Sequence, residues 1–418
     1  MSDPLLNPPA PPSARPPGDL GSANPVRASV RLALGTASAL GLARFAYGLL
    51  LPAMSDDLRW SLTEAGTVSA ANGFGYLVGA VVTGAAVRRL GTAAAFRLGM
   101  VLTAVALAAT AIGGEYPMLL IARAAAGAAG AVVFIAGGVI ASRTAVRTLS
   151  AAPITIYFAG TGLGIIFSGA TVPPLGEHWR LAWLVLGAAA GVATLVSWTA
   201  ARTDGEDPFV ATGRARVRPL SRTAVAYVLF AAGYITYITF LSAYLADRHT
   251  PVAQVMLIWM ALGLAVVAAP ALWSRPITNW PDGRALAVLL GALGMGAALA
   301  LAAPAPPVIL LSAIIYGATF MGVPAAVTAL IKGGTPPADW TGTLSVFTVL
   351  FAAGQTIGPW IAGVLADGTS AAATLAWTAI LCGAAALVAA TVRPRRSAGA
   401  TSAGDLAPRD GAPDIAPR

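Results

Sequence analysis

The sequence predicts an all-α membrane protein of twelve transmembrane helices arranged as two six-helix bundles. Three observations predict it: the chain is strongly apolar, its apolar runs are long enough to cross a bilayer, and its basic residues alternate between loops. The 418 residues are 57% hydrophobic and 10% charged, with a mean hydropathy of +0.75. Soluble domains carry about 25% charged residues, so the composition excludes a soluble enzyme or binding domain.

Each predicted span is close to the length of about 20 residues that a slightly tilted helix needs to cross the hydrocarbon core. The twelve spans are residues 30–54, 66–87, 94–112, 117–142, 152–172, 180–201, 223–246, 253–274, 285–303, 307–331, 342–366 and 372–392.

The basic residues test this count. With the N-terminus inside, 21 of the 26 basic residues fall in inner loops and tails, and only Arg59, Arg180 and Arg248 fall outside. The other two, Arg44 and Arg123, lie within spans. This distribution follows the positive-inside rule and predicts a multi-pass membrane protein with both termini in the cytoplasm. Twenty-five of the 26 basic residues are Arg, which indicates a GC-rich bacterial genome and hence the inner membrane. The net charge of +9 thus comes from the loops and tails that are retained in the cytoplasm, and no nucleic acid is expected as a partner.

The longest inner loop divides the spans into six plus six. The predicted segments are a disordered cytoplasmic N-tail (1–29), an N-terminal bundle (30–201), a central cytoplasmic loop (202–222), a C-terminal bundle (223–392) and a disordered C-tail (393–418). The N-tail is rich in proline and polar residues and lacks the charged and apolar regions of a signal peptide.

The two halves share a short internal sequence repeat. AGTGLG (159–164) in the fifth span and AGQTIG (353–358) in the eleventh are 194 residues apart, and the same offset carries the first span onto the seventh. This repeat predicts pseudo-symmetric bundles. Gly160 and Gly164 form a G-x-x-x-G pair, as do Gly354 and Gly358, and such pairs let helices approach closely.

No catalytic, metal or cofactor site is expected. The single cysteine, Cys382, lies in the last span, and His178 and His249 lie in outer loops. A membrane enzyme would need a cluster such as paired histidines and carboxylates within the spans, and the sequence offers none. The expected partners are a small-molecule substrate and the lipid bilayer, with the chain as a monomer.

Carboxylates are confined to the ends of spans and to loops. Glu64 follows Ser61 by three residues, which predicts a capping box at the outer start of the second span. Because buried carboxylates are the usual proton carriers of coupled transporters, coupling would have to use an end-lying group, such as Asp57 or Glu64, or the substrate itself.

Arg44 is the first candidate site residue, because a charge near the middle of a span costs about 2.5–3.5 kcal/mol even on the mildest insertion scale. Asn72 and Arg123 are predicted at similar depth in the outer half of the N-terminal bundle. Two buried cations without a buried carboxylate favour an anionic ligand. The alternative is structural: Arg44 would pair with backbone carbonyls, Asn72 or an end-lying carboxylate, and Arg123 would be a latch.

Further polar and aromatic residues would complete a substrate site between the halves. The predicted substrate-binding residues are Arg44, Tyr47, Asn72, Tyr76, Arg123, Tyr157, Tyr237 and Gln355, with Tyr234 and Tyr316 as further candidates for the cavity wall. Tyrosines also pack between helices or anchor at interfaces, and this alternative stays open for each.

The loop after the second span, G84-A-A-V-R-R89-L-G91-T, resembles the major facilitator signature Gly-x-x-x-Asp-Arg-x-Gly-Arg/Lys. Gly84, Arg89 and Gly91 match, while Arg88 stands where the family has Asp. The resemblance implies the major facilitator fold and a gating role for Gly84, Arg88, Arg89 and Gly91. Arg123-Ala-Ala-Ala-Gly127 resembles part of a second motif, whose Arg the family links to coupling.

A narrower resemblance covers nearly the whole membrane region. ARFAYGLLLPAM (43–54), NGFGY (72–76), YGATFMGVP (316–324) and GQTIGPWIAG (354–363) resemble the YbfB/YjiJ-type group of this superfamily. The resemblance implies a fold and a transport role but no substrate.

The sequence therefore predicts a secondary active transporter of a small organic solute, preferably an anion, that works by alternating access and is coupled to an ion or proton. The nearest alternative is a multidrug or metabolite exporter of the same fold. An alternative from another class is a sensor or scaffold that binds without transporting.

Overall fold

The computed structural model describes residues 25–112, 114–201 and 214–392; the predicted tails over 1–24 and 393–418 and most of the central loop lie outside the described residues. The described part is all-helical and contains 12 helices long and apolar enough to cross a membrane, which confirms the predicted fold class. The first helix begins at Pro25, before the predicted start of the first span at residue 30.

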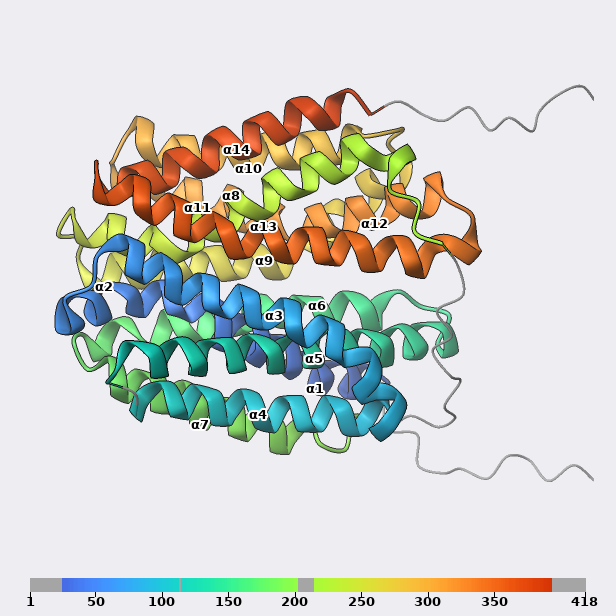
Figure 1. The fold of residues 1–418 in the computed structure, drawn as a ribbon, viewed down its shortest axis with the longest axis horizontal. Coiled ribbons are helices and arrows are strands. Elements are labelled where there is room, and N and C mark those ends of the chain that lie inside the picture. The colour runs from blue at the N-terminus through green and yellow to red at the C-terminus, as the bar shows by residue number, and fades with distance from the viewer. Residues whose placement is uncertain (1–24, 113, 202–213, 393–418) are drawn as a thin grey trace, which may run out of the picture.

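The first six spans pack together as the N-terminal bundle, drawn in blue to green (Figure 1). Its elements are α1 (Pro25–Thr36), η1 (Ala37–Phe45), α2 (Ala46–Leu58), α3 (Leu62–Leu90), α4 (Thr92–Ile112), α5 (Tyr116–Arg147), α6 (Ala152–Thr171), η2 (Pro173–Leu175) and α7 (Trp179–Ser197).

The other six spans form the C-terminal bundle, drawn in yellow-green to red. Its elements are η3 (Arg218–Leu220), α8 (Ser221–Ala246), α9 (Val252–Asn279), α10 (Arg284–Ala302), α11 (Pro306–Phe320), α12 (Gly322–Gly334), η4 (Pro337–Asp339), α13 (Trp340–Asp367) and α14 (Ala372–Ala390).

Two spans differ from the continuous helices that the sequence predicts. The first is interrupted by η1, a π-helix of nine residues that contains Arg44. The tenth is broken at Met321 into α11 and α12. Both interruptions lie beside the cavity described below, where irregular backbone is tolerated because protein rather than lipid surrounds it.

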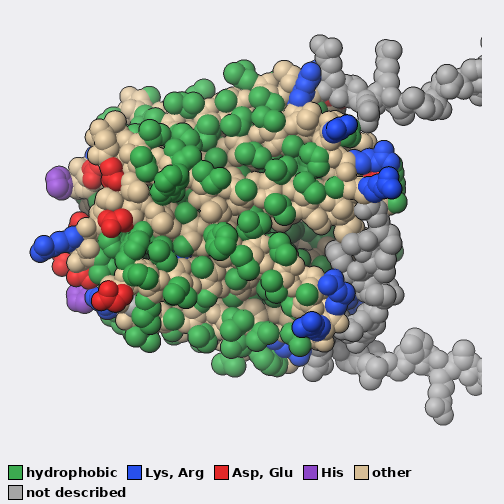
Figure 2. All heavy atoms as spheres, in the orientation of Figure 1, with side chains coloured by type: hydrophobic (Ala, Val, Ile, Leu, Met, Phe, Trp, Pro, Cys, Tyr) green, Lys and Arg blue, Asp and Glu red, His purple; other side chains and the backbone are tan. Residues whose placement is uncertain are grey.

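The two ends of the molecule differ in charge (Figure 2). Lys and Arg side chains gather at the end on the right, here the arginine-rich end, where α3 finishes with Arg88 and Arg89 and α10 begins with Arg284. Acidic side chains gather at the opposite end, here the acidic end, which includes Glu64 at the start of α3 and Asp367 at the end of α13.

Local sequence signals set the boundaries of α3. The predicted capping box is present: Ser61 Oγ accepts the Glu64 N–H at 3.1 Å, and a Glu64 carboxylate oxygen accepts the Ser61 N–H at 2.9 Å. At the other end, Gly91 has φ +82°, a left-handed backbone that glycine adopts without the steric penalty of a side chain.

The repeated glycines have equivalent packing roles in the two bundles. Gly160 and Gly164 of α6 lie against the backbone of α1 and η1, and a Cβ added at Gly164 would lie 2.8 Å from the Cα of Gly41. Gly354 and Gly358 of α13 lie against the backbone of α8 in the same way. The sequence repeat therefore corresponds to the same close helix packing, which occurs once in each bundle.

The bundles meet along three helix pairs: α3 with α13, α6 with α9, and α2 with α8. Glycines again bring the backbones close. Gly66 faces the carbonyl of Pro359, and Gly162 faces that of Gly263. These pairs enclose the space between the bundles from two sides and leave a cavity in its middle.

Candidate functional site

A cavity of about 600 Å³ lies between the two bundles. Its inner end contains Arg44, and it extends to Thr155 near the start of α6 and Thr278 near the end of α9. Both of those helix ends belong to the arginine-rich end of the molecule, so the cavity extends from the middle of the membrane toward that end.

The cavity is mostly apolar and contains one charge. Of the 26 described residues that line it, Arg44 is the one charged residue and ten are aromatic, in a chain that is 7% aromatic overall. Its volume is within the range of about 300–1,000 Å³ that is typical of small-molecule sites. A concave apolar site with one fixed charge suits a small amphiphilic ligand of opposite charge.

Arg44 is 7% exposed and lies in the π-helix η1. Such π-helical segments are rare and occur frequently at functional sites. Its Nη2 donates to Gln355 Oε1 across the bundle interface at 2.7 Å, and its guanidinium lies 5.5 Å from the ring centre of Tyr76. No carboxylate neutralises this cation among its described contacts, so the positive charge remains available to a ligand.

Gln355 and Tyr234 support this arrangement from the C-terminal bundle. Tyr234 donates its hydroxyl to the same Gln355 Oε1 at 3.2 Å, and Tyr234 lines the cavity, whereas Gln355 is fully buried behind it. Arg44 Nε and Gln355 Nε2 are buried donors without a hydrogen-bond partner among the described residues. Native interiors rarely leave such donors unpaired, so these two donors are open to an acceptor that a ligand or a water supplies.

Arg123 has a different environment from Arg44. It is fully enclosed, donates from Nη2 to the Ala43 carbonyl at 2.6 Å, and lies over the rings of Trp183 at 4.7 Å and Tyr47 at 5.4 Å. Its own carbonyl accepts the amide N–H of Asn72 at 3.1 Å. Neither Arg123 nor Asn72 lines the cavity. Asn72 thus ties α3 to α5, and Arg123 ties α5 to the π-helix that presents Arg44.

Of the remaining predicted tyrosines, one lines the cavity and three are buried away from it. Tyr76 lines the cavity beside Arg44. Tyr47 and Tyr157 are buried inside the N-terminal bundle, where their hydroxyls donate to the Ala65 and Val133 carbonyls, and Tyr237 is buried inside the C-terminal bundle, where its hydroxyl bonds to that of Ser312. Of the eight predicted substrate-binding residues, the cavity therefore brings together Arg44 and Tyr76, with Gln355 directly behind them.

The predicted gating residues lie together at the arginine-rich end. Gly84 belongs to the last two turns of α3, Arg88 and Arg89 are exposed at its end, and Gly91 forms the tight connection to α4. They lie away from the cavity lining, on the helix that packs against α13 of the other bundle.

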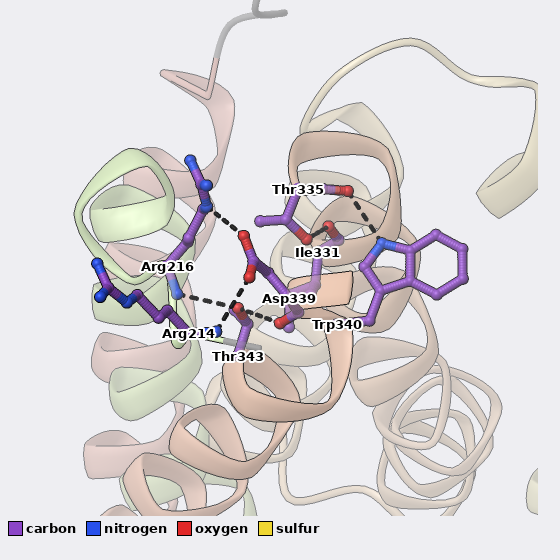
Figure 3. A network of polar contacts seen from close by, with 7 residues as sticks. All are labelled: Arg214, Arg216, Ile331, Thr335, Asp339, Trp340 and Thr343. Carbon is purple, nitrogen blue, oxygen red and sulfur yellow. Dashed lines mark hydrogen bonds and ion pairs between the residues drawn. The ribbon is translucent and has the colours of Figure 1, made fainter. Parts of the chain in front are cut away.

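A polar network at this end fixes the segment that precedes α8 (Figure 3). The carboxylate of Asp339, at the start of α13, accepts hydrogen bonds from the Arg214 N–H at 3.0 Å and from Arg216 Nε. The Arg216 N–H donates to Thr343 Oγ1 at 3.0 Å. These contacts attach the described end of the central loop to the C-terminal bundle.

At the acidic end, Asp367 joins the two bundles. Its carboxylate accepts the N–H groups of Leu62 at 2.7 Å and Thr63 at 3.0 Å, and also the Thr63 hydroxyl. A carboxylate of α13 thus caps the start of α3. It accepts hydrogen bonds from N–H groups that have no partner inside the helix, and its negative charge lies at the positive end of the helix dipole. Deeper, the Ser69 and Thr239 hydroxyls join α3 to α8 at 3.0 Å. This end of the interface is closed.

Sequence reasoning missed most of the aromatic lining. Phe230, Phe320, Phe351 and Trp273 line the cavity from the C-terminal bundle, and Phe134 lies opposite them. A signal was present in the seventh span, where Tyr227, Phe230 and Tyr234 have the spacing of one helical face. The pattern alone did not say whether that face meets lipid, protein or a cavity.

Comparison with known proteins supports the fold and the family. A family model described as "Uncharacterised MFS-type transporter YbfB" matches residues 36–393. No curated protein sequence matches the chain.

Among solved structures, a D-xylose–proton symporter is similar with a TM-score of 0.69 at 13% identity, covering 88% of this chain and 97% of that one. The nucleoside transporter NupG gives a TM-score of 0.63 at 15% identity, with 86% and 97% covered. A bacterial homologue of the human lysosomal transporter Spinster, inward-facing and occupied, gives 0.65 at 14% identity, with 88% and 98% covered. At such low identity these likenesses establish the fold alone.

Proposed function

Since the chain belongs to the family of the uncharacterised MFS-type transporter YbfB, we propose that it is a secondary transporter that moves a small organic anion across the bacterial inner membrane. The observation that carries this proposal is Arg44, a buried cation at the inner end of the cavity with no acidic partner among its described contacts. Transport would proceed by rocking of the two bundles around this site.

The orientation follows from charge. We place the arginine-rich end in the cytoplasm, because loops rich in Arg and Lys are retained there. The cavity then extends toward the cytoplasm, while the capping contact of Asp367 with α3 closes the periplasmic end. In this orientation the structure is an inward-facing state.

The preference for an anion rests on the donors around the inner end of the cavity. An ionised carboxylate would accept hydrogen bonds from the Arg44 guanidinium, and such charge-assisted bonds are about twice as strong as neutral ones. Arg123 also has unpaired donors, Nε and Nη1, but it would not share this ligand, because it is fully buried, is enclosed by two aromatic rings and does not line the cavity. Arg123 and Asn72 would instead position η1.

Coupling to a proton would use a carboxylate at the acidic end. Asp57 is bonded to Trp179 and Arg180 within one bundle, and Glu64 completes the capping box. Asp367 differs from both, because it spans the two bundles. Its protonation would weaken the contact that keeps the periplasmic end closed, which links proton uptake to opening.

A multidrug exporter is the second candidate, and the aromatic lining favours it. Exporters of amphiphilic cations need an acidic group to attract their substrates, whereas the one charge among the described lining residues is Arg44. The same experiment distinguishes the two candidates.

The test is a thermal-shift screen of purified protein against organic anions, organic cations and neutral drugs. A ligand that binds only the folded state raises the melting temperature according to its excess over Kd. We expect anions to stabilise the wild type and the control Arg284→Ala, which removes an exposed arginine of α10, but not Arg44→Ala. Cations or neutral drugs that stabilise all three proteins equally would exclude the anion and favour the exporter.

A further inference from the structure

Five aromatic residues of the C-terminal bundle form one side of the cavity. This aromatic wall comprises Tyr227, Phe230 and Tyr234 of α8, Phe320 of α11 and Phe351 of α13. Phe230 and Tyr234 have ring centroids 4.7 Å apart at an interplanar angle of 17°, and Tyr234 and Phe351 are 5.5 Å apart at 23°. Tyr234 and Phe320 are 6.1 Å apart at 19°.

The rings of the aromatic wall are nearly parallel to one another. Aromatic side chains in protein interiors adopt both edge-to-face and offset-stacked pairs. In the wall, the stacked pairs among Tyr227, Phe230, Tyr234, Phe320 and Phe351 have interplanar angles of 26° or less. A planar ring that enters the cavity would therefore meet several rings in a matching orientation.

Aromatic rings also line the opposite side of the cavity. Tyr76 and Phe134 are 6.4 Å apart at an interplanar angle of 58°, and Phe134 and Phe158 are 5.4 Å apart at 54°. The cavity therefore has aromatic groups on both of its sides, nearly parallel rings from the C-terminal bundle and mutually tilted rings from the N-terminal one.

The charge adjoins the wall directly. Tyr234, a member of the wall, shares Gln355 Oε1 with Arg44. The unpaired donors Arg44 Nε and Gln355 Nε2 lie at this same junction. A ligand whose carboxylate reached Arg44 would thus have the rest of its framework beside the aromatic wall.

We propose that the substrate class is an aromatic carboxylate, a planar ring that carries its carboxylate directly or through a short link. The carboxylate binds the Arg44 guanidinium, and the ring lies between the aromatic wall and the tilted rings of the N-terminal bundle. This inference rests on the proposed function, that the site takes an organic anion, and adds the requirement for a planar ring.

The test compares four probes of matched size or charge by isothermal titration calorimetry: benzoate, cyclohexanecarboxylate, benzamide and acetate. Benzoate and cyclohexanecarboxylate share charge and similar bulk but differ in planarity. A favourable ring pair changes affinity by about 2- to 10-fold. With rings on both sides of the cavity, we expect benzoate to bind roughly 10-fold more tightly than cyclohexanecarboxylate, and benzamide and acetate to bind more weakly than benzoate.

Variants separate the two proposals. In Phe351→Leu and Phe230→Leu, the preference for benzoate should fall to less than about 3-fold, while binding of cyclohexanecarboxylate persists and shows that the protein is folded. The control Phe74→Leu changes an aromatic residue that is 55% exposed on α3, outside the cavity, and should keep the full preference.

Equal affinity for benzoate and cyclohexanecarboxylate in the wild type would overturn the aromatic class. If Arg44→Met then binds neither carboxylate, the proposed anion site still stands. An unchanged preference in both Leu variants would also overturn it. If benzamide binds as tightly as benzoate, the ring is recognised without the charge, and the proposed anion transport falls instead.

Discussion

Replacing Arg44 by methionine separates a ligand-binding arginine from a structural one. Methionine is long and apolar, so the variant removes the charge while it retains much of the side-chain volume. In the structure the guanidinium has one hydrogen bond, to Gln355, worth about 1.5–3 kcal/mol for a charged donor. Its contact with Tyr76 adds about 0.5–1 kcal/mol. Burying the charge in the membrane costs about 2.5–3.5 kcal/mol.

These contributions nearly cancel. We therefore expect the ligand-free variant to differ from the wild type by less than about 1 kcal/mol in its free energy of unfolding, or a change of at most about 3 °C in Tm. Binding should respond differently. Loss of the charge-assisted contacts to a carboxylate removes about 3 kcal/mol, which corresponds to a roughly 100-fold higher Kd.

The assay is thermal denaturation in detergent combined with titration of an organic anion. Arg123→Met is the matched comparison, because it removes the same group from an enclosed position. That variant loses a charged hydrogen bond to Ala43, worth about 1.5–3 kcal/mol, and two ring contacts worth up to about 2 kcal/mol each when desolvated, which together exceed the burial cost of about 2.5–3.5 kcal/mol that it relieves. Its Tm should fall clearly. If Arg44→Met lowers Tm as much as Arg123→Met and leaves anion affinity unchanged, Arg44 is structural and the reasoning is refuted.

The remaining predictions concern the interface and the packing. Asp367→Ala removes a cap shared between the bundles and should shift the population at least about 10-fold toward states open at the acidic end. Spin-label distances across that end should therefore lengthen. Distances equal to those of the control Asp247→Ala would contradict this. Gly164→Ala should destabilise the protein by about 1–3 kcal/mol, because its Cβ would lie 2.8 Å from the Cα of Gly41. The control Gly191→Ala faces open space and should be neutral or slightly stabilising in the same thermal denaturation; equal effects of the two would argue against close helix contact. Asp339→Ala should increase trypsin cleavage beside the Arg216 segment several-fold, and unchanged cleavage would mean that the network does not hold this segment.

Local rules worked well where one residue or one helix face decides the outcome. The capping box of Ser61 and Glu64 is present as predicted, because both partners lie within one turn of the same helix. The repeated glycines also lie where two helices pack closely in each bundle, because close helix packing requires small residues at the contact. The π-helix around Arg44 was not predicted, because packing beside the cavity stabilises it rather than local propensity. The break at Met321 was not predicted either, although Pro324 lacks the N–H that would bond to the Phe320 carbonyl and so favours a break there.

The candidate site shows the limit of such rules. Arg44 and Tyr76 could be selected from charge and helical spacing, and both line the cavity. Arg123 and Asn72 had the same residue types at a similar depth, yet they bond to backbone within one bundle and lie outside the cavity. Depth in the membrane is readable from the sequence, whereas the partner of a buried side chain depends on which helix packs against it.

The sequence by itself determined the class of the protein, its twelve helices and its buried charge, because a bilayer admits only long apolar segments and makes each intramembrane charge conspicuous. Only the tertiary structure decided what that charge meets. Arg44 and Gln355 are 311 residues apart, and the aromatic wall combines residues of three helices from the opposite bundle. Helical periodicity specifies one face of one helix, and the site arises from the packing of two bundles whose relative placement no local pattern encodes.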